Sequence, residues 1–191
     1  ENADVVSVAQ EAGKTCVQVF FYRSKQNWGN QSYFPLHDKS HTAEEVLASF
    51  ITQFYENKNV PAEILINKKI KDLNLIKAAL EKKEKKFISI KNPIKGNGLK
   101  LSKMAEKNAK EALTRKIFES ETNTKLLNEV ADKFKLNISP RTVEVYDNSH
   151  IQGSNSVGAL ITFSTEGFIK KQYRKFNIKN KELSPGDDYG M

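Results

Sequence analysis

The order of strand-like and helical segments limits the folds open to this chain more than any other feature of its sequence. Two runs rich in β-branched and aromatic residues come first, at 5–10 and 16–23, and a third strand is predicted at 31–36. The segment 24–30 (SKQNWGN) has turn chemistry and is predicted to link the second strand to the third. The chain is therefore expected to begin with a three-strand meander.

Helices and strands alternate after this meander. Thr42 and Glu45 have the spacing of a capping box, and apolar residues recur at helical spacing from there to Phe54. The pattern then predicts, in turn, a strand, an amphipathic helix and a strand at 62–67, 70–80 and 86–90. A three-strand meander followed by alternating helices and strands is the order of an RNase H-like α/β fold, which is the fold class predicted here.

A long helix is predicted next, from Leu99 to about Lys135. Unbroken, it would be roughly 55 Å long. The segment 120–124 (SETNT) consists mostly of poor helix formers, so a kink or a break is expected there.

A second meander begins after Pro140, with strands expected at 142–147, 157–164 and 168–178 and a tight turn at 165–167. No further helix or strand is completed after Pro185, so the chain is expected to be a piece of a longer protein. The predicted division has three parts: a complete RNase H-like unit, a connecting helix or helices, and the opening strands of a second, truncated RNase H-like unit, at 1–98, 99–139 and 140–191.

Composition narrows the classes of partner and compartment. The net charge of +8 favours an anionic partner such as nucleic acid, although lysine-rich composition alone can produce the same value. Cys16 is the single cysteine, which excludes an intrachain disulfide, and it is expected to be a small core residue. The sequence has no apolar stretch of membrane-spanning length and no signal-peptide pattern, so no membrane association and a cytoplasmic location are expected.

Asp147 is the candidate metal ligand. Side chains alternate along a strand, so Val143, Val145 and Asp147 share a face, and the acid is expected to emerge at the strand's end after two buried valines. Its carboxylate suits Mg²⁺ or Mn²⁺, which prefer oxygen ligands. A local turn or cap is the alternative role for this acid. His150 is open to the same choice, as a ligand or as a surface histidine.

Cations follow on the predicted third strand of the second meander. They either neutralise phosphates or protect an edge strand from aggregation. The candidates for nucleic-acid binding are Lys170, Lys171, Arg174 and Lys175. In the first unit Asp4 is expected to lie before the first strand and Glu11 just past it, so that unit is predicted to be metal-free.

The second meander resembles the start of the C-terminal endonuclease domain of the UvrC family, the incision subunits of the bacterial UvrABC excinuclease. The resemblance rests on VEVYDNSHIQGSNSVGALITF (143–163), KKQYRKFNIK (170–179) and PGDDYGM (185–191). Upstream, 16–35 and the helix at 104–113 resemble the segments that precede that domain.

The resemblance implies an RNase H-like nuclease that uses Mg²⁺ or Mn²⁺ to cut damaged double-stranded DNA on the 5′ side of the lesion. It makes Asp147 a catalytic metal ligand, whose partner aspartate and histidine lie further along the family's sequence. His150 belongs to the motif without being the catalytic histidine, and Asp187 and Asp188 match a non-catalytic position. UvrB is implied as a partner through a segment that this sequence lacks.

The fragment is expected to be inactive by itself, because one ligand cannot fix a metal's geometry. The alternative is a non-catalytic scaffold, or a module that contacts DNA or UvrB. A small-molecule substrate is not expected, because KGNG (95–98) is too short for a dinucleotide-binding fingerprint.

Overall fold

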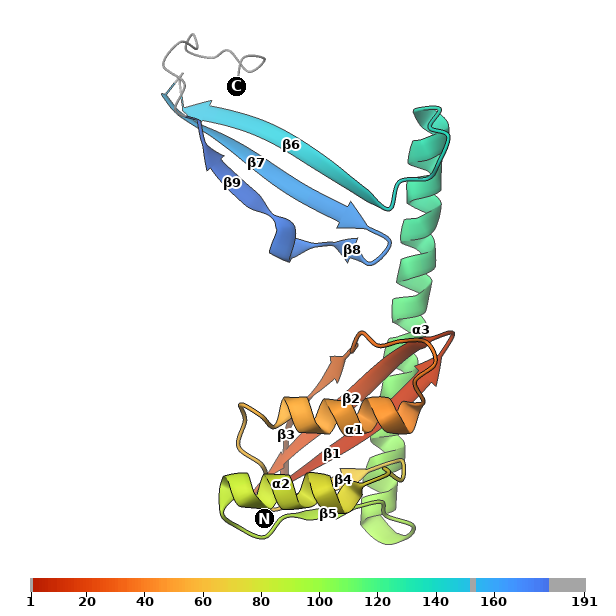
Figure 1. Cartoon of the computed structure of the whole chain (residues 1–191), viewed down its shortest axis with the longest axis vertical. Helices are drawn as coiled ribbons and strands as arrows, with labels where there is room; N and C mark the ends of the chain where they lie inside the picture. The colour runs from red at the N-terminus through yellow and green to blue at the C-terminus, as the bar shows by residue number, and fades with distance from the viewer. Residues whose placement is uncertain (1, 152–153, 179–191) are drawn as a thin grey trace. The chain divides into compact units, whose positions relative to one another are not determined.

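The chain divides into two compact units, Glu1–Lys116 and Ile117–Met191, each described here by itself. The computed structural model describes residues 2–151 and 154–178 (Figure 1). A single long helix, α3 (Gly96–Lys133), contributes its first part to the first unit and the rest to the second. In the described part of the chain, no helix is both long and apolar enough to cross a membrane.

The first unit is built on a five-stranded mixed sheet in the order β3-β2-β1-β4-β5. The meander β1-β2-β3 is antiparallel, while β1, β4 and β5 run parallel. This confirms the predicted α/β class, although individual boundaries differ from the prediction by a few residues. Besides α3, its elements are β1 (Ala3–Glu11), β2 (Lys14–Arg23), β3 (Gln26–Tyr33), α1 (Ala43–Phe54), β4 (Glu63–Ile66), α2 (Leu73–Glu84) and β5 (Ser89–Lys91).

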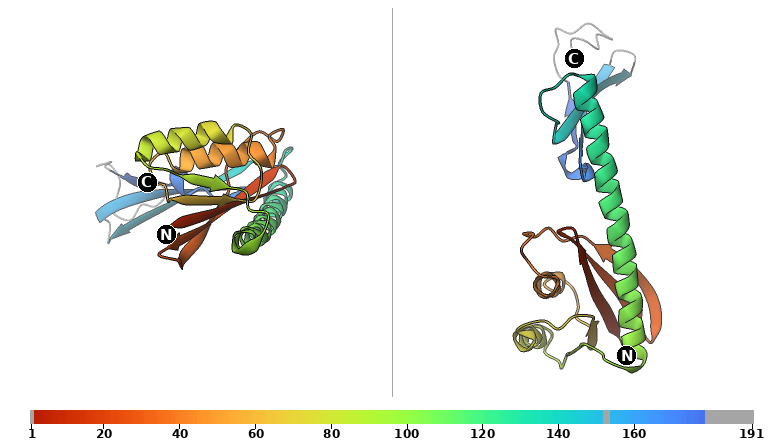
Figure 2. Two further views of the ribbon diagram at one scale, coloured as in Figure 1. Left: turned by 90° about the horizontal axis from the view of Figure 1, so that it is seen from below. Right: turned by 90° about the vertical axis from the view of Figure 1, so that its right-hand side faces the viewer.

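Helices α1 and α2 cover one face of this sheet, and α3 covers the other (Figure 2). The predicted capping box starts α1: the Glu45 amide donates to Thr42 Oγ1 at 3.3 Å, and the Thr42 amide donates to Glu45 Oε2 at 2.8 Å. The core between the sheet and these two helices includes Val6, Val8, Val17, Val19, Leu47, Ile51, Ile64, Ile66, Leu80 and Ile88.

On the opposite face, Leu101 and Ala105 of α3 pack against apolar side chains of β1, β2 and β4. Ser7 Oγ of β1 donates a hydrogen bond to the carbonyl of Ser102 at 3.0 Å. Because β1 is central and covered on both sides, six consecutive residues of this strand are buried. A strand covered on both faces is expected to be apolar at successive positions, and in β1 the buried Asp4 and Ser7 are the exceptions.

The break expected in α3 at 120–124 is wrong, because the helix is continuous from end to end. The polar side chains there bond in ways that the helix tolerates. Thr124 Oγ1 donates to the carbonyl of Ser120 at 2.8 Å, one turn back, and Asn123 Nδ2 donates to the carbonyl of Thr165 at 3.2 Å. Tertiary contacts therefore outweigh weak helix propensity in this segment.

The turn predicted at 24–30 is shorter in the structure than expected. Only Ser24 and Lys25 form the turn, with φ values of +50° and +65°, and β3 begins at Gln26. Two residues with positive φ match the tight hairpin whose twist suits its flanking strands. Pairing with β2 therefore draws the polar residues after Lys25 into the sheet, despite their local preference for turns.

The second unit carries an antiparallel sheet in which β7 is paired on both sides. β6 lies along one edge of β7, while β8 and β9 pair with its other edge. The elements are β6 (Thr142–Ile151), β7 (Ser154–Ser164), β8 (Gly167–Phe168), the 3-10 turn η1 (Lys170–Gln172) and β9 (Arg174–Asn177).

The continuous third strand predicted at 168–178 is thus wrong. The amide of Gln172 donates to the carbonyl of Ile169 at 2.9 Å, and that of Tyr173 donates to the carbonyl of Lys170 at 3.2 Å. These bonds fold the middle of the segment into a turn, leaving two short strands in place of one. The three-part division at residues 98 and 139 stays a prediction.

Candidate functional site

Asp147 lies within β6 and is exposed to solvent, but the sequence-based description of its surroundings needs two corrections. The strand continues four residues past it, to Ile151, because β7 pairs along that length. Val145 is 52% exposed and Val143 is partly buried, so the acid does not follow two buried valines. Among the described strands, β6 pairs with β7 alone, and a strand with one neighbour has side chains that are more accessible to water.

One transverse row of the sheet joins Asp147 to a cation. Asp147 is paired with Ala159 of β7, and Ala159 is paired with Lys175 of β9. Residues directly opposite in a sheet share a face, so the carboxylate and the ammonium project from the same side. Two strand spacings separate their backbones by about 10 Å. We call this row the Asp147–Lys175 strip; only the small Ala159 side chain lies between its two charged ends.

The other predicted cations do not join this strip. Arg174 precedes Lys175 on β9 and therefore points to the opposite face. Its guanidinium donates to the carbonyls of Lys171 and Tyr173, at 2.9 and 2.8 Å, and so holds the turn that precedes β9. Lys170 and Lys171 are exposed on η1 rather than on a strand.

The Asp147 carboxylate is the right type of donor for Mg²⁺ or Mn²⁺, which prefer oxygen ligands. Among the residues described, no group of three or more histidine, cysteine, aspartate or glutamate side chains is placed to hold a metal ion. Asp147 fits such an ion in chemistry but supplies a single ligand. The His150 side chain and the pair Asp187 and Asp188 lie outside what the structure describes.

The first unit does carry a carboxylate on its first strand, contrary to the prediction. Asp4 lies inside β1 and is 1% exposed. Its Oδ1 accepts a hydrogen bond from Arg23 Nη1 at 2.7 Å, and its Oδ2 accepts one from the Tyr55 hydroxyl, also at 2.7 Å. The parallel pairing of β1 with β4 begins at Ala3, and this draws Asp4 into the sheet.

Both oxygens of Asp4 are therefore occupied by protein donors. Burial, followed by the charge of Asp4, raises the pKa of Tyr55 well above its ordinary value, which keeps the hydroxyl protonated as a donor. Asp4 acts as an internal counter-ion for Arg23, a role that no local sequence pattern reveals because its two partners lie 19 and 51 residues away.

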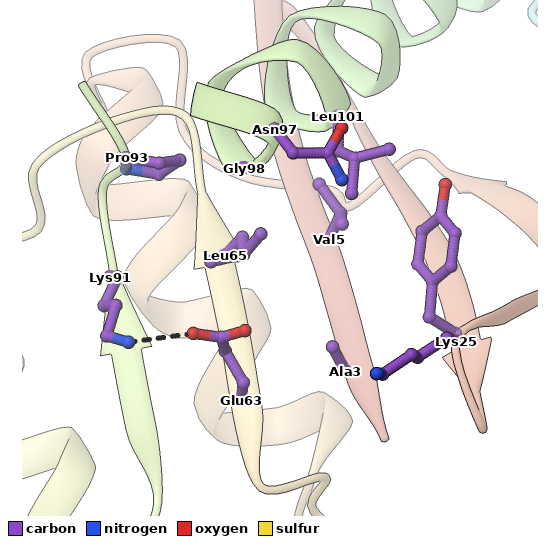
Figure 3. Close-up of a pocket in the computed structure, with 11 residues that line it drawn as sticks. Ala3, Val5, Lys25, Glu63, Leu65, Lys91, Pro93, Asn97, Gly98 and Leu101 are labelled. Carbon is purple, nitrogen blue, oxygen red and sulfur yellow. Dashed lines mark hydrogen bonds and ion pairs between the residues drawn. The ribbon is translucent and has the colours of Figure 1, made fainter. Parts of the chain in front are cut away.

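A cavity of about 540 Å³ opens on the α3 side of the first sheet (Figure 3). Its walls combine apolar side chains, such as Val5 and Leu65, with the Tyr22 ring. The rim carries Lys25 and an ion pair between Glu63 and Lys91 at 2.9 Å. Its mixed lining includes no pair of groups arranged as nucleophile and base.

The fold defines the class of protein. A sheet in the order 3-2-1-4-5, with an antiparallel meander, parallel outer strands and helices on both faces, is that of RNase H-like proteins. Residues 2–116 match the model of the "UvrC Ribonuclease H-like domain", and residues 131–191 match that of the "UvrC RNAse H endonuclease domain". The chain belongs to the UvrC family.

Curated relatives agree with this assignment over the whole chain. Proteins named "UvrABC system protein C" are 47% identical in Chelativorans sp. (strain BNC1), 49% in Rhodopseudomonas palustris (strain BisB18) and 48% in Bartonella quintana (strain Toulouse). Each alignment covers 100% of this chain and 29%, 27% and 28% of the relative, respectively, so the chain spans less than a third of their length.

Proposed function

We propose that this chain is a segment of the nuclease subunit of the UvrABC nucleotide-excision-repair system, and that it supplies the first metal ligand of the 5′ incision site. Family membership supports the repair assignment, and the match of 131–191 to an endonuclease domain supports nuclease chemistry. Damaged double-stranded DNA is the proposed substrate, UvrB the proposed partner and the cytoplasm the proposed location.

The observation that carries the proposal is the Asp147–Lys175 strip. A divalent metal held in part by Asp147 would supply a water-derived nucleophile and stabilise charge on the phosphate. Lys175 lies on the same face of the sheet and is suited to contact another phosphate of the DNA strand being cut. Ala159 lies between them, and its small side chain projects little from that face of the sheet.

The test is to place Asp147→Asn in a full-length protein that carries this segment and to assay both incisions on a damaged duplex with the rest of the UvrABC system. The 5′ cut is expected to disappear, while any cut on the 3′ side, for which Asp147 is not a proposed ligand, persists. Glu144→Gln is the matched control, since Glu144 is an exposed carboxylate on the opposite face of the same strand. Retention of the 5′ cut in the Asp147 variant would exclude the proposed role.

A second function, that of a non-catalytic scaffold, is proposed for the first unit. It rests on Asp4, whose two carboxylate oxygens accept hydrogen bonds from Arg23 and Tyr55. Neither oxygen is therefore left without a protein partner to bind a metal ion. Adding or removing metal ligands elsewhere in the chain should leave the Asp4–Arg23 ion pair intact. If Asp4→Asn abolished incision in a folded protein without changing its stability, Asp4 would be catalytic and the scaffold role would be wrong.

A further inference from the structure

Trp28 is the single tryptophan of the sequence, and 73% of its surface is exposed. It lies in β3, an edge strand of the first sheet, at a break in the pairing register. Phe21 is paired with Gly29 and Tyr22 with Asn27, so Trp28 is an extra residue between two consecutive pairs. This arrangement is a β-bulge, a feature that redirects a side chain.

The bulge is held by its neighbours. Gly29 has a φ of +125°, which residues with a side chain rarely adopt, and its amide donates to Asn27 Oδ1 at 2.8 Å. A Cβ on Gly29 would meet no atom within 4 Å, so the glycine serves backbone conformation and not close packing. The chain thus maintains a specific local geometry that leaves a large aromatic ring in water.

The surroundings of Trp28 are polar and lack negative charge. The exposed residues beside it on β3 carry side-chain amides: Gln26, Asn27, Asn30 and Gln31. No aspartate or glutamate occurs from Ala12 to His37, a segment that contains three basic residues. The exposed apolar residues Phe34 and Leu36 follow the far end of β3. Along an extended chain Phe34 is about 20 Å from Trp28, so these residues do not form an apolar patch with the indole.

Lys25 supplies a cation on the same hairpin, at the rim of the cavity on the α3 side of the sheet. It forms one half of the two-residue turn, is exposed, and is joined by no ion pair to any carboxylate in the described part of the chain. Three residues of chain place the backbones of Lys25 and Trp28 within about 10 Å of each other. An aromatic face, side-chain amides and a free cation are the groups that bind unpaired nucleotides: bases stack on the ring and phosphates pair with the ammonium.

We propose that the β2–β3 hairpin binds single-stranded nucleic acid, with one base stacked on the Trp28 indole and a neighbouring phosphate at Lys25. The inference goes beyond the proposed function because it assigns a nucleic-acid contact to the unit that lacks the incision site and does not require Asp147. A protein partner fits less well, because an interface centred on a tryptophan is normally rich in apolar neighbours.

The sole tryptophan provides a direct readout. Titrating the 191-residue chain with a thymidine oligonucleotide at low salt is expected to quench Trp28 fluorescence. An abasic oligomer of equal length carries the same phosphates without bases, and it is expected to leave that fluorescence unchanged. By fluorescence anisotropy of a labelled oligonucleotide, Trp28→Ala is expected to weaken binding about 5- to 150-fold, whereas Trp28→Phe weakens it less.

Lys25→Gln is expected to lower the slope of log affinity against log salt by about 0.7, and Trp28→Ala is expected to leave that slope unchanged. Phe87→Ala is the matched control, since Phe87 is 72% exposed in the same unit but has Lys77 over its ring. It should bind like the parent chain. Circular dichroism confirms that each variant is folded.

The proposal is overturned by oligonucleotide binding without a change in Trp28 fluorescence, by equal quenching with the abasic oligomer, or by equal losses in Trp28→Ala and Phe87→Ala. Absence of any oligonucleotide binding at low salt also overturns it, and protection of the hairpin by another UvrABC protein would then mark it as a protein interface. Asp147→Asn is expected to leave the quenching intact, so this result and the incision assay can fail independently.

Discussion

The Tyr55 hydroxyl donates a hydrogen bond of 2.7 Å to Asp4 Oδ2 at a point where both side chains are 1% exposed. This contact joins the end of α1 to the first strand of the sheet. On the other side of the carboxylate, Arg23 forms an ion pair with Asp4 Oδ1 at 2.7 Å, so the buried acid has a charged partner as well as a neutral donor.

Breaking this arrangement should destabilise the first unit. Asp4→Asn leaves Arg23 without its counter-ion and is expected to cost about 3 kcal/mol of unfolding free energy. Tyr55→Phe removes a donor to a charged acceptor and is expected to cost about 2 kcal/mol. Urea denaturation measures both. Glu11→Gln, at the exposed end of the same strand, should change stability little, and equal effects of Glu11→Gln and Asp4→Asn would contradict the assigned role.

Cys16 should be inert towards thiol reagents in the folded chain. The residue is fully buried, and burial raises the pKa of its thiol to about 11. At pH 8, a disulfide reagent is expected to modify Cys16 only after unfolding in urea. Rapid labelling of the native chain would show that the strand opens locally.

The same pKa shift predicts a direction for alkaline stability. The folded state holds the thiol proton more tightly than the unfolded state, whose thiol has a pKa near 9.0. The stabilisation is therefore complete below about pH 9 and is lost as the pH rises towards about 11. Comparing the parent chain with Cys16→Ala in urea at pH 8 and pH 10.5 tests this, because the variant should lose less stability over that range.

The isolated chain should not cut DNA. A single carboxylate, Asp147, cannot fix a metal ion and align water against a phosphate. Incubation of the chain with Mn²⁺ and a nicked, damaged duplex is expected to give no product on a denaturing gel. Appreciable cutting that disappears in Asp147→Ala would show that the described strands already form a working site.

Lys175 and Arg174 should behave differently although they are adjacent and both exposed. Lys175→Gln is expected to weaken duplex binding and to lower its salt dependence by about 0.9 in log–log slope, at unchanged stability. Arg174→Gln removes two hydrogen bonds to backbone carbonyls and should instead loosen the turn before β9. Salt titrations of DNA affinity, with thermal melting of each variant, distinguish the two effects. Equal salt slopes for both variants would refute the assignment of Lys175 to the Asp147–Lys175 strip.

Local signals in the sequence were sufficient for much of the first unit. The capping box of Thr42 and Glu45 located the start of α1 correctly, because both of its hydrogen bonds lie within four residues. The strands of β1 and β2 were recognised from their apolar residues. Where the structure differs from the prediction, pairing between distant segments is the cause. Pairing with β2 makes a polar, turn-prone segment into the strand β3, and pairing with β4 helps to hold Asp4 inside the sheet.

The candidate site also depends on pairing between distant segments. A motif identified Asp147, but its row could not be read from the sequence, because the pairings of Asp147 with Ala159 and of Ala159 with Lys175 depend on the register of three strands. The sequence pattern predicts one strand over 168–178, but a turn within it separates cations that alternation alone would group together.

Ala159 keeps the surface between the two charged ends of the strip low. Its methyl group projects little from the sheet, so a bulkier residue at this position would rise between the two charged side chains and keep one phosphate from reaching both Lys175 and a metal ion held by Asp147. Access to the Asp147 face is thus governed by an uncharged residue, and it can be narrowed or closed by mutation without altering either charge.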